Sequence, residues 1–151
     1  IDVPGYERVE VDSAARFIGT MNYGYAGTRE LNEALTSRFV VIQMPSIDQD
    51  GLVRLLSDEF PTLEKKYKEQ FAQLFLDLQK KCKNAEISEK ALDLRGLLDA
   101  LRLIRRGVGA SRALDIGITN KAFDSYEQSL IRDVIAARIP AKLDRSRLFT
   151  D

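Results

Sequence analysis

The chain has 151 residues, 44% of them hydrophobic and 30% charged, and its 23 basic and 23 acidic residues leave a formal net charge of zero. This composition is typical of a globular protein and excludes a disordered chain. The charge balance gives no overall electrostatic reason to expect nucleic acid or an anionic membrane as the main partner.

The sequence contains no histidine and a single cysteine, Cys82. The lack of histidine excludes Ser-His-Asp and Cys-His catalysis within these residues, together with the usual zinc sites. Cys82 cannot form an internal disulfide, so we interpret it as an apolar filler on a helix. No apolar run approaches the roughly 20 residues that cross a bilayer, and no signal peptide opens the chain, so a cytoplasmic protein without a membrane partner is expected.

The first 45 residues indicate strands and loops around one helix. Two apolar strands are expected at Ala15–Met21 and Phe39–Met44, and a Gly-rich turn at Tyr23–Gly27. Thr28 is a suitable N-cap for a helix that runs to about Arg38. The nearly continuous apolar run of the second strand is typical of a strand buried on both faces of a parallel sheet. These elements are too few for a core of their own, so we expect the rest of the sheet to lie outside this chain.

From about residue 46 to residue 140 the pattern is helical. Apolar residues recur at helical spacing, and capping or breaking residues mark the ends of each segment. Five helices are expected. The first is capped by Asp48 and ends at Pro61, and the second is capped by Thr62 and runs past Cys82. The third is capped by Ser88 or Asp93 and ends at Gly107, the fourth is Ser111 to Ile116, and the fifth ends at Pro140 with its inward residues at Phe123, Tyr126, Leu130, Val134 and Ile135.

The composition changes near Pro45 to Asp48. We therefore predict three parts: residues 1–45 as the end of an α/β subdomain, residues 46–140 as a helical bundle, and residues 141–151 as a loose tail without periodicity. The expected fold class is mainly α with a small α/β portion.

The segment Phe17–Phe39 reads FIGTMNYGYAGTRELNEALTSRF: a strand that ends in Thr-Met-Asn, a Gly-rich loop, and a helix that ends in Ser-Arg-Phe. It resembles the segment from sensor 1 to the arginine finger in AAA+ ATPases of the MoxR-like, dynein-related group. The resemblance covers roughly residues 7 to 140 but only the second half of the family's module. It implies that the first part ends the parallel-sheet nucleotide-binding subdomain and that the helical part is the lid.

By that resemblance, Asn22 is sensor 1 beside the γ-phosphate, and Arg38 is the arginine finger that reaches the ATP of a neighbouring subunit. An amide can hold an attacking water in line, and a guanidinium neutralises charge on the transferred phosphoryl group. Taken singly, an Asn at a strand end is a turn residue and an Arg at a helix end is a solvated charge. The combined order of elements favours the nucleotide interpretation. Glu33, on the same helix, is expected to make a subunit contact.

A second arginine, sensor 2, opens a lid helix in this family and reaches the γ-phosphate of its own subunit. Two residues are candidates. Arg95 opens an amphipathic helix that ends in Arg105-Arg106-Gly107, and it is our choice because the longer helix suits the lid. Arg112 lies in Gly109-Ala110-Ser111-Arg112-Ala113, which is similar to the Gly-Ala-Ser-Pro-Arg-Ala string of some MoxR lids but lacks the proline.

The departures from the family are equally clear. The sequence has no G-x-x-x-x-G-K-[ST] loop to cradle phosphates and no apolar strand ending in Asp-Glu. We therefore expect a fragment of a longer gene product that begins upstream of Ile1. The resemblance implies that the intact parent uses ATP and magnesium, forms a ring that is expected to be a hexamer, and remodels or activates a partner protein, which can be a von Willebrand factor A domain protein. This chain alone is expected to bind neither ATP nor magnesium and to be inactive.

Two other functions are compatible with the residues. A non-enzymatic helical interaction domain would make Asn22 and Arg38 incidental. A nucleic-acid-binding helical module would use Arg102, Arg105 and Arg106, but those charges suit the C-terminal end of a helix and no aromatic residues are interleaved with them. Nucleic acid is therefore not an expected partner.

Overall fold

The computed structural model describes residues 4–5, 7, 10–21 and 32–150. The chain divides into two compact units, Ile1–Met44 and Pro45–Asp151, and each is a body of its own. Asn22, the Gly-rich turn and Thr28 lie outside the described residues. None of the helices in the described part is long and apolar enough to cross a membrane.

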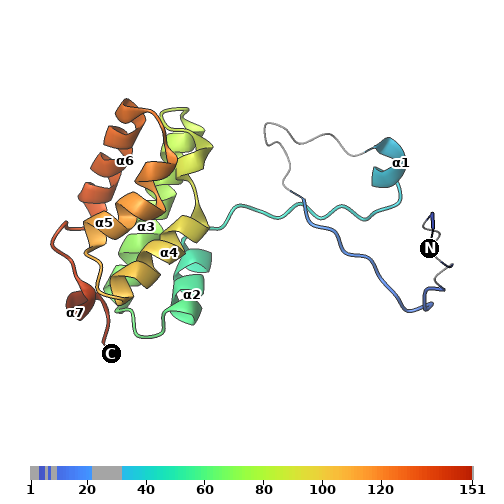
Figure 1. Cartoon of the computed structure of the whole chain (residues 1–151), viewed down its shortest axis with the longest axis horizontal. Coiled ribbons are helices and arrows are strands. Elements are labelled where there is room, and N and C mark those ends of the chain that lie inside the picture. Colours follow the sequence, from blue (N-terminus) through green and yellow to red (C-terminus); the bar gives the residue numbers. More distant parts are fainter. Residues whose placement is uncertain (1–3, 6, 8–9, 22–31, 151) are drawn as a thin grey trace. The chain divides into compact units, whose positions relative to one another are not determined.

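The second unit is a bundle of helices around one hydrophobic core (Figure 1). Its α-helices are α2 (Gln49–Glu59), α3 (Lys65–Lys83), α4 (Leu94–Arg105), α5 (Ala110–Gly117), α6 (Ser125–Arg138) and α7 (Arg145–Leu148), with 3-10 turns η1 (Glu89–Ala91) and η2 (Thr119–Lys121). α2 packs against α3, α3 against α6, and α4 against α5.

Aspartates start the main helices. The Asp48 carboxylate accepts a hydrogen bond from the N–H of Gly51 at 2.8 Å and caps α2. The Asp93 carboxylate caps α4 by accepting from the N–H of Arg95. Of the two residues expected as the N-cap of this helix, Ser88 and Asp93, the structure therefore has Asp93. A side-chain oxygen at this position satisfies an N–H that has no partner within the helix. α4 ends before Gly107, whose φ of 98° suits a residue without a Cβ.

The apolar stripes of α2 to α6 meet in the core, as their spacing predicts. The largest fully buried side chains of the core, with Ile118 and Ile139 just beyond the ends of α5 and α6, are Phe71, Leu52, Leu56, Leu74, Leu78, Leu97, Leu101, Ile104, Leu114, Ile118, Ile131 and Ile139. Burying such side chains contributes roughly 1.5–3 kcal/mol each relative to leaving them in water. The core explains why residues 46–140 form a stable helical unit.

Two expected inward residues of the last helix are exposed. Phe123 is 86% exposed and Tyr126 is 71% exposed. Phe123 precedes α6, which begins at Ser125. The buried stripe of α6 runs through Ile131 and Ile135 and reaches back toward Glu127, so the neighbouring Tyr126 faces solvent. The assignment of Thr62 as an N-cap is also wrong, because α3 begins at Lys65 and its N-cap position is occupied by Glu64.

The described part of the tail, residues 141–150, is packed, contrary to the expectation of a loose end. Leu143, Leu148 and Phe149 are buried. An isolated antiparallel bridge joins Leu63 to Phe149, and the N–H of Glu64 donates to the carbonyl of Leu148 at 2.9 Å. These contacts link segments more than 80 residues apart, and local periodicity cannot reveal them.

We expect Phe149→Leu to lower the free energy of unfolding by about 1 kcal/mol, because the ring is buried edge to face against Phe60 with 6.3 Å between centroids. Urea unfolding followed by circular dichroism measures this. The control Tyr126→Leu removes an exposed ring and should change stability by less than about 0.5 kcal/mol. Equal midpoints for Phe149→Leu and the unsubstituted chain would show that the tail is not part of the core.

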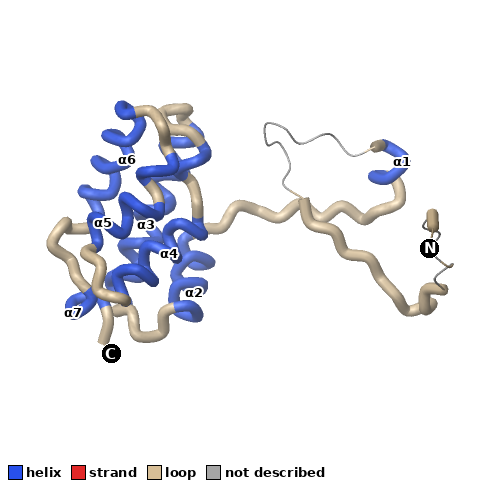
Figure 2. The backbone as a smooth tube through the Cα atoms, viewed as in Figure 1, coloured by secondary structure: helices blue, strands red, loops and turns tan. Residues whose placement is uncertain are grey.

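The first unit has one helix among its described residues, α1 (Glu33–Thr36). The strands expected at Ala15–Met21 and Phe39–Met44 are not formed. Figure 2 shows no strand in the described part of the chain. A strand needs a neighbour for its backbone N–H and C=O groups and for its apolar side chains. Here Val40 is 90% exposed and Val41, on the opposite face of an extended chain, is 69% exposed, so neither face has cover.

The fold is therefore mainly α, as predicted, whereas the small α/β portion is not present as a sheet among the described residues. The change from sparse structure to a packed bundle falls between Met44 and Pro45.

Candidate functional site

Two catalytic residues, Asn22 and Arg38, are predicted in the first unit, and of these the structure describes Arg38. It follows α1, its side chain is exposed, and its guanidinium donates to the carbonyl of Ala34 at 3.1 Å. No carboxylate of the described residues forms an ion pair with it. Glu33 is exposed on the same short helix. Among the described residues, the hydrogen bond that holds Arg38 therefore comes from its own helix end.

Arg95 is the second residue of α4 and its side chain is exposed. Its backbone N–H donates to the Asp93 carboxylate at 3.0 Å. Burial of Asp93 alone would raise its pKa, but the hydrogen bond and charge of Lys121 and the backbone N–H groups outweigh it, so the pKa is lowered and the carboxylate stays ionised. Asp93 also forms an ion pair with Lys121, which ties the start of α4 to η2.

The start of α4 is further held by a close helix crossing. A Cβ built on Gly96 would lie 2.0 Å from the carbonyl oxygen of Gly117, and one built on Gly117 would lie 2.3 Å from the carbonyl oxygen of Gly96. The two backbones therefore touch directly. A glycine on the buried face of an amphipathic helix is the sequence signal for such an approach, and our reasoning from the sequence missed it.

The same crossing separates the two candidates for sensor 2. The first turn of α4, with Arg95, lies against the last turn of α5, so Arg112 in the first turn of α5 lies toward the other end of α4. Arg112 is also exposed. The two arginines therefore lie toward opposite ends of α4, and the choice between them stays open.

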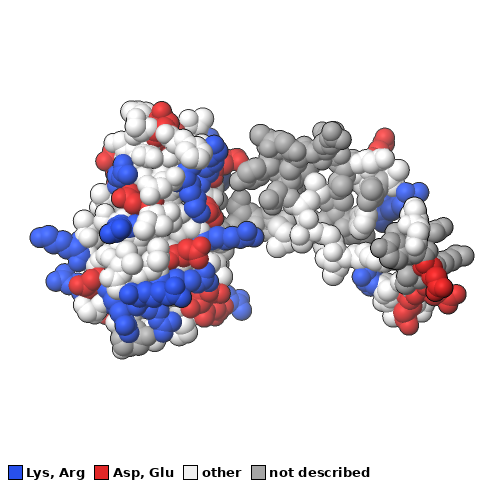
Figure 3. Space-filling view, viewed as in Figure 1, with Lys and Arg blue, Asp and Glu red and all other residues white. Residues whose placement is uncertain are grey.

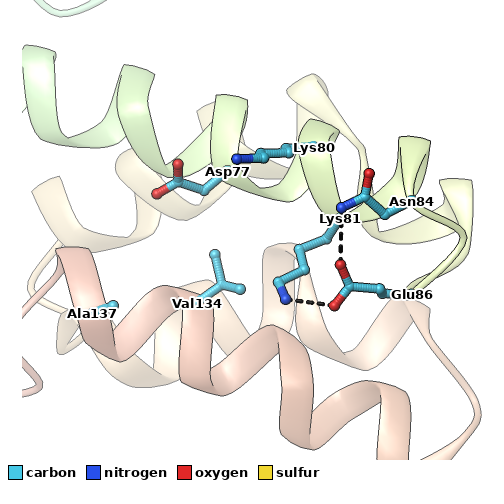
Figure 4. Close-up of a pocket in the computed structure, with 7 residues that line it drawn as sticks. All are labelled: Asp77, Lys80, Lys81, Asn84, Glu86, Val134 and Ala137. Atoms are coloured by element: carbon cyan, nitrogen blue, oxygen red, sulfur yellow. Dashed lines mark hydrogen bonds and ion pairs between the residues drawn. The ribbon is translucent and has the colours of Figure 1, made fainter.

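An open pocket of about 390 Å³ lies between the end of α3 and α6 (Figure 4). Its two carboxylates are already paired: Arg138 Nε donates to Asp77 at 2.6 Å, and Lys81 and Asn84 both donate to Glu86, at 2.5 and 3.1 Å. These donors lower the pKa of Glu86, the bond from Lys81 most. Paired ions without a nucleophile or a free base are typical of a solvated surface and not of a catalytic centre.

The described residues offer neither a metal centre nor an activated thiol. They contain no group of three or more Cys, Asp or Glu side chains placed to hold a metal ion. Cys82 is half-buried, and its pKa is raised by burial and by the charges of Glu89 and Glu127. A raised pKa keeps the thiol protonated and unreactive, which agrees with a packing role.

Comparison with known proteins finds relatives in Bacillus subtilis and Staphylococcus aureus. The chain is 33% identical over 128 residues to the uncharacterized protein YojN of Bacillus subtilis (strain 168), a match to 85% of this chain and 42% of that protein. It is 36% identical over 118 residues to an uncharacterized protein of Staphylococcus aureus (strain NCTC 8325), a match to 78% of this chain and 44% of that protein.

The chain thus spans less than half the length of the curated relatives it matches. No family model matches it. No solved structure matches it either.

Proposed function

We propose that this chain is the carboxyl-terminal part of an AAA+ ATPase of the MoxR-like, dynein-related group, which couples ATP hydrolysis to the remodelling or activation of a partner protein. In this proposal residues 1–45 complete the nucleotide-binding subdomain, residues 46–140 are its helical lid, and Asn22, Arg38 and Arg95 serve the nucleotide. The rest of the subdomain belongs to a longer protein.

The observation that carries the proposal is the uncovered apolar segment before the bundle. Within Phe39–Met44, Val40, Ile42 and Met44 are 90%, 77% and 81% exposed, and the earlier Ile18 is 92% exposed. A run of this kind is stable in water only when other elements cover it, as on both faces of a parallel sheet. Relatives more than twice as long as the matched region leave room for those elements.

In this proposal ATP and magnesium are held mainly by the rest of the longer protein and not by this chain alone. It lacks a phosphate-binding loop, and its described residues have no carboxylate cluster for a cation. The exposed guanidinium groups of Arg38 and Arg95 are suited to join a site whose main part lies elsewhere. Arg112 is the alternative to Arg95 as sensor 2, since each opens a helix of the bundle.

The partners follow from the family resemblance. The parent would act in the cytoplasm as a ring, expected to be a hexamer, in which Arg38 reaches the nucleotide of the next subunit. Its partner can be a von Willebrand factor A domain protein. An exposed arginine beside an exposed helix, α1, is compatible with a subunit contact.

A second candidate function is a non-enzymatic helical interaction domain. The observation in its favour is that the bundle has a complete core of its own while Phe123 and Tyr126 remain on its surface, 86% and 71% exposed. Exposed aromatic residues are enriched where proteins bind one another. Under this alternative Arg38 has no role in any reaction.

Titration with ATP and magnesium tests the proposal. The 151-residue chain should show no binding up to millimolar nucleotide, whereas the full-length protein that contains it should bind and hydrolyse ATP. Isothermal calorimetry and phosphate release measure the two steps. Tight binding by the 151 residues, or a full-length protein that neither binds nor hydrolyses ATP, would contradict the assignment.

A further inference from the structure

The first turn of α4, which carries Arg95, is held by an aspartate that uses both of its oxygens. Asp93 Oδ1 accepts a hydrogen bond from the N–H of Arg95 at 3.0 Å, and Oδ2 forms an ion pair with the ammonium of Lys121. One carboxylate therefore ties the backbone of Arg95 to η2. The ion pair joins residues 28 positions apart, so it is a contact that only the fold creates.

Gly96 makes room for this arrangement. A Cβ built on Gly96 would lie 2.8 Å from Lys121 Nζ, as well as 2.0 Å from the carbonyl oxygen of Gly117. The ammonium of Lys121 therefore lies against the first turn of α4, where any residue larger than glycine would crowd it. The same glycine permits both the close crossing of α4 and α5 and the approach of Lys121 to Asp93.

Lys121 projects from a well-packed base. It is the last residue of η2, and the neighbouring side chains of Ile118, Thr119 and Ala122 are no more than 1% exposed. A backbone with buried residues on both sides cannot shift without disturbing a close-packed core. The ammonium therefore holds Asp93, and with it the start of α4, toward a fixed point of the bundle.

The first turn of α5, which carries the other candidate, Arg112, is capped differently. Its N-cap is Gly109, and no side chain of the described residues caps it. The N–H of Ala110 donates instead to the carbonyl of Leu143 at 3.1 Å. A side chain that must meet a ligand to within roughly 0.5 Å needs a fixed backbone and supporting residues around it. The support at the start of α4 therefore favours Arg95 over Arg112.

Ion pairs between elements are common on this bundle, so a pair alone indicates no function. Figure 3 shows Lys and Arg atoms beside Asp and Glu atoms at several places on the visible face of the bundle. Arg132, for example, pairs with Asp115 at 3.0 Å, and these side chains are about as exposed as those of Lys121 and Asp93. The pair of Asp93 with Lys121 differs because its carboxylate also bonds to the backbone of a residue that is proposed to serve the nucleotide.

We propose that Lys121 and Asp93 are positioning residues for Arg95, and that they hold the start of α4 so that the Arg95 guanidinium meets the γ-phosphate of ATP. The inference rests on the proposed function and extends it, because it selects Arg95 over Arg112 and adds two residues that act through Arg95. The physical reason is preorganisation. A side chain whose backbone is already fixed loses less freedom on binding, so the same contact contributes more affinity.

Equilibrium binding of a fluorescent ATP analogue with magnesium to the full-length protein tests the proposal as a double-mutant cycle. Arg95→Ala should weaken binding by about tenfold. Lys121→Met, which removes the ammonium and keeps a long side chain, should weaken binding by about fivefold, and it should have no further effect in the Arg95→Ala background. Lys121→Arg should retain most of the affinity, because it keeps the charge that holds Asp93.

Arg132→Met is the matched control, because it removes a cation from an ion pair with an aspartate elsewhere on the bundle. It should leave the affinity for the analogue within about twofold of that of the unsubstituted protein. Three results would overturn the proposal: unchanged affinity in Lys121→Met, an equal loss in Arg132→Met, or a loss in Lys121→Met that persists in the Arg95→Ala background.

Amide hydrogen exchange in the 151-residue chain, without nucleotide, separates this inference from the proposed function. Followed by NMR, the amides of Arg95, Gly96 and Leu97 should exchange at least about threefold faster in Lys121→Met and be unchanged in Arg132→Met. Unchanged exchange in Lys121→Met would overturn the positioning role even if ATP binds. Faster exchange together with a full-length protein that binds no ATP would instead refute the proposed function, and the role toward the nucleotide would fall with it.

Discussion

Replacing Arg38 with alanine in the full-length protein is expected to lower the turnover number for ATP by about 10³-fold or more, while the affinity for ATP changes little. The magnitude is that of arginine fingers in other phosphoryl-transfer systems. The physical reason is that charge develops on the phosphoryl group only during the reaction, so a guanidinium supplied by the neighbouring subunit lowers the barrier more than it strengthens binding. In the structure Arg38 is exposed and its guanidinium donates a hydrogen bond to the carbonyl of Ala34, so it can extend toward a partner.

Steady-state phosphate release measures turnover, and a fluorescent nucleotide measures affinity. Arg38→Lys keeps the charge but loses the planar pair of donors, so it should recover only part of the rate. Arg54→Ala, at an exposed position of α2, is the control and should retain full activity. If Arg38→Ala turns over ATP within twofold of the unsubstituted protein, the non-enzymatic alternative is favoured.

Replacing Gly96 with alanine is expected to destabilise the helical bundle by about 1–2 kcal/mol. The new Cβ would meet the carbonyl oxygen of Gly117 at 2.0 Å, and a backbone oxygen cannot swing aside as a flexible side chain can. α4 and α5 must separate, and such overpacking costs typically 1–3 kcal/mol or more. Alanine's better helix propensity returns about 1 kcal/mol of that.

Thermal and urea unfolding of the 151-residue chain measure the change. Gly117→Ala should behave alike, because its Cβ would meet the carbonyl oxygen of Gly96 at 2.3 Å. Gly109→Ala is the control: nothing lies within 4 Å of its added Cβ, so the cost should stay near the roughly 0.5 kcal/mol of a changed N-cap. Similar losses for Gly96 and Gly109 would show that the helices do not touch at this crossing.

The bundle was largely predictable because its signals are local. Asp48 and Asp93 cap their helices through residues two or three positions away, and Gly107 ends α4 where its positive φ is needed. The apolar stripe of α3 alone identifies most of its buried side. Such features depend on a few neighbouring residues, which a sequence shows directly.

The errors arose where contacts are distant in sequence. Glu127 accepts hydrogen bonds from the N–H and the hydroxyl of Ser88, both at 2.6 Å and 39 residues away. That contact holds the polar side of the first turn of α6 inward and leaves Phe123 and Tyr126 outside. The packed tail depends in the same way on the pairing of Phe149 with Leu63. No local pattern contains these partners.

The candidate site was only partly predictable for a different reason. Asn22 lies outside the described residues, and Arg38, Arg95 and Arg112 are exposed arginines whose proposed partners belong to other parts or other subunits. Without its ligand, the guanidinium of a nucleotide-binding arginine has the same geometry as that of any exposed arginine.

The central claim is that Phe39–Met44 is a sheet strand whose neighbours lie in the rest of a longer protein. Amide hydrogen exchange, read by mass spectrometry on peptides that cover these residues, tests it most directly. In the 151-residue chain their amides should exchange at the rate of an unstructured peptide, and in the full-length protein they should be slowed by about 10³-fold or more. Equally fast exchange in both would contradict the claim and leave the segment as a linker.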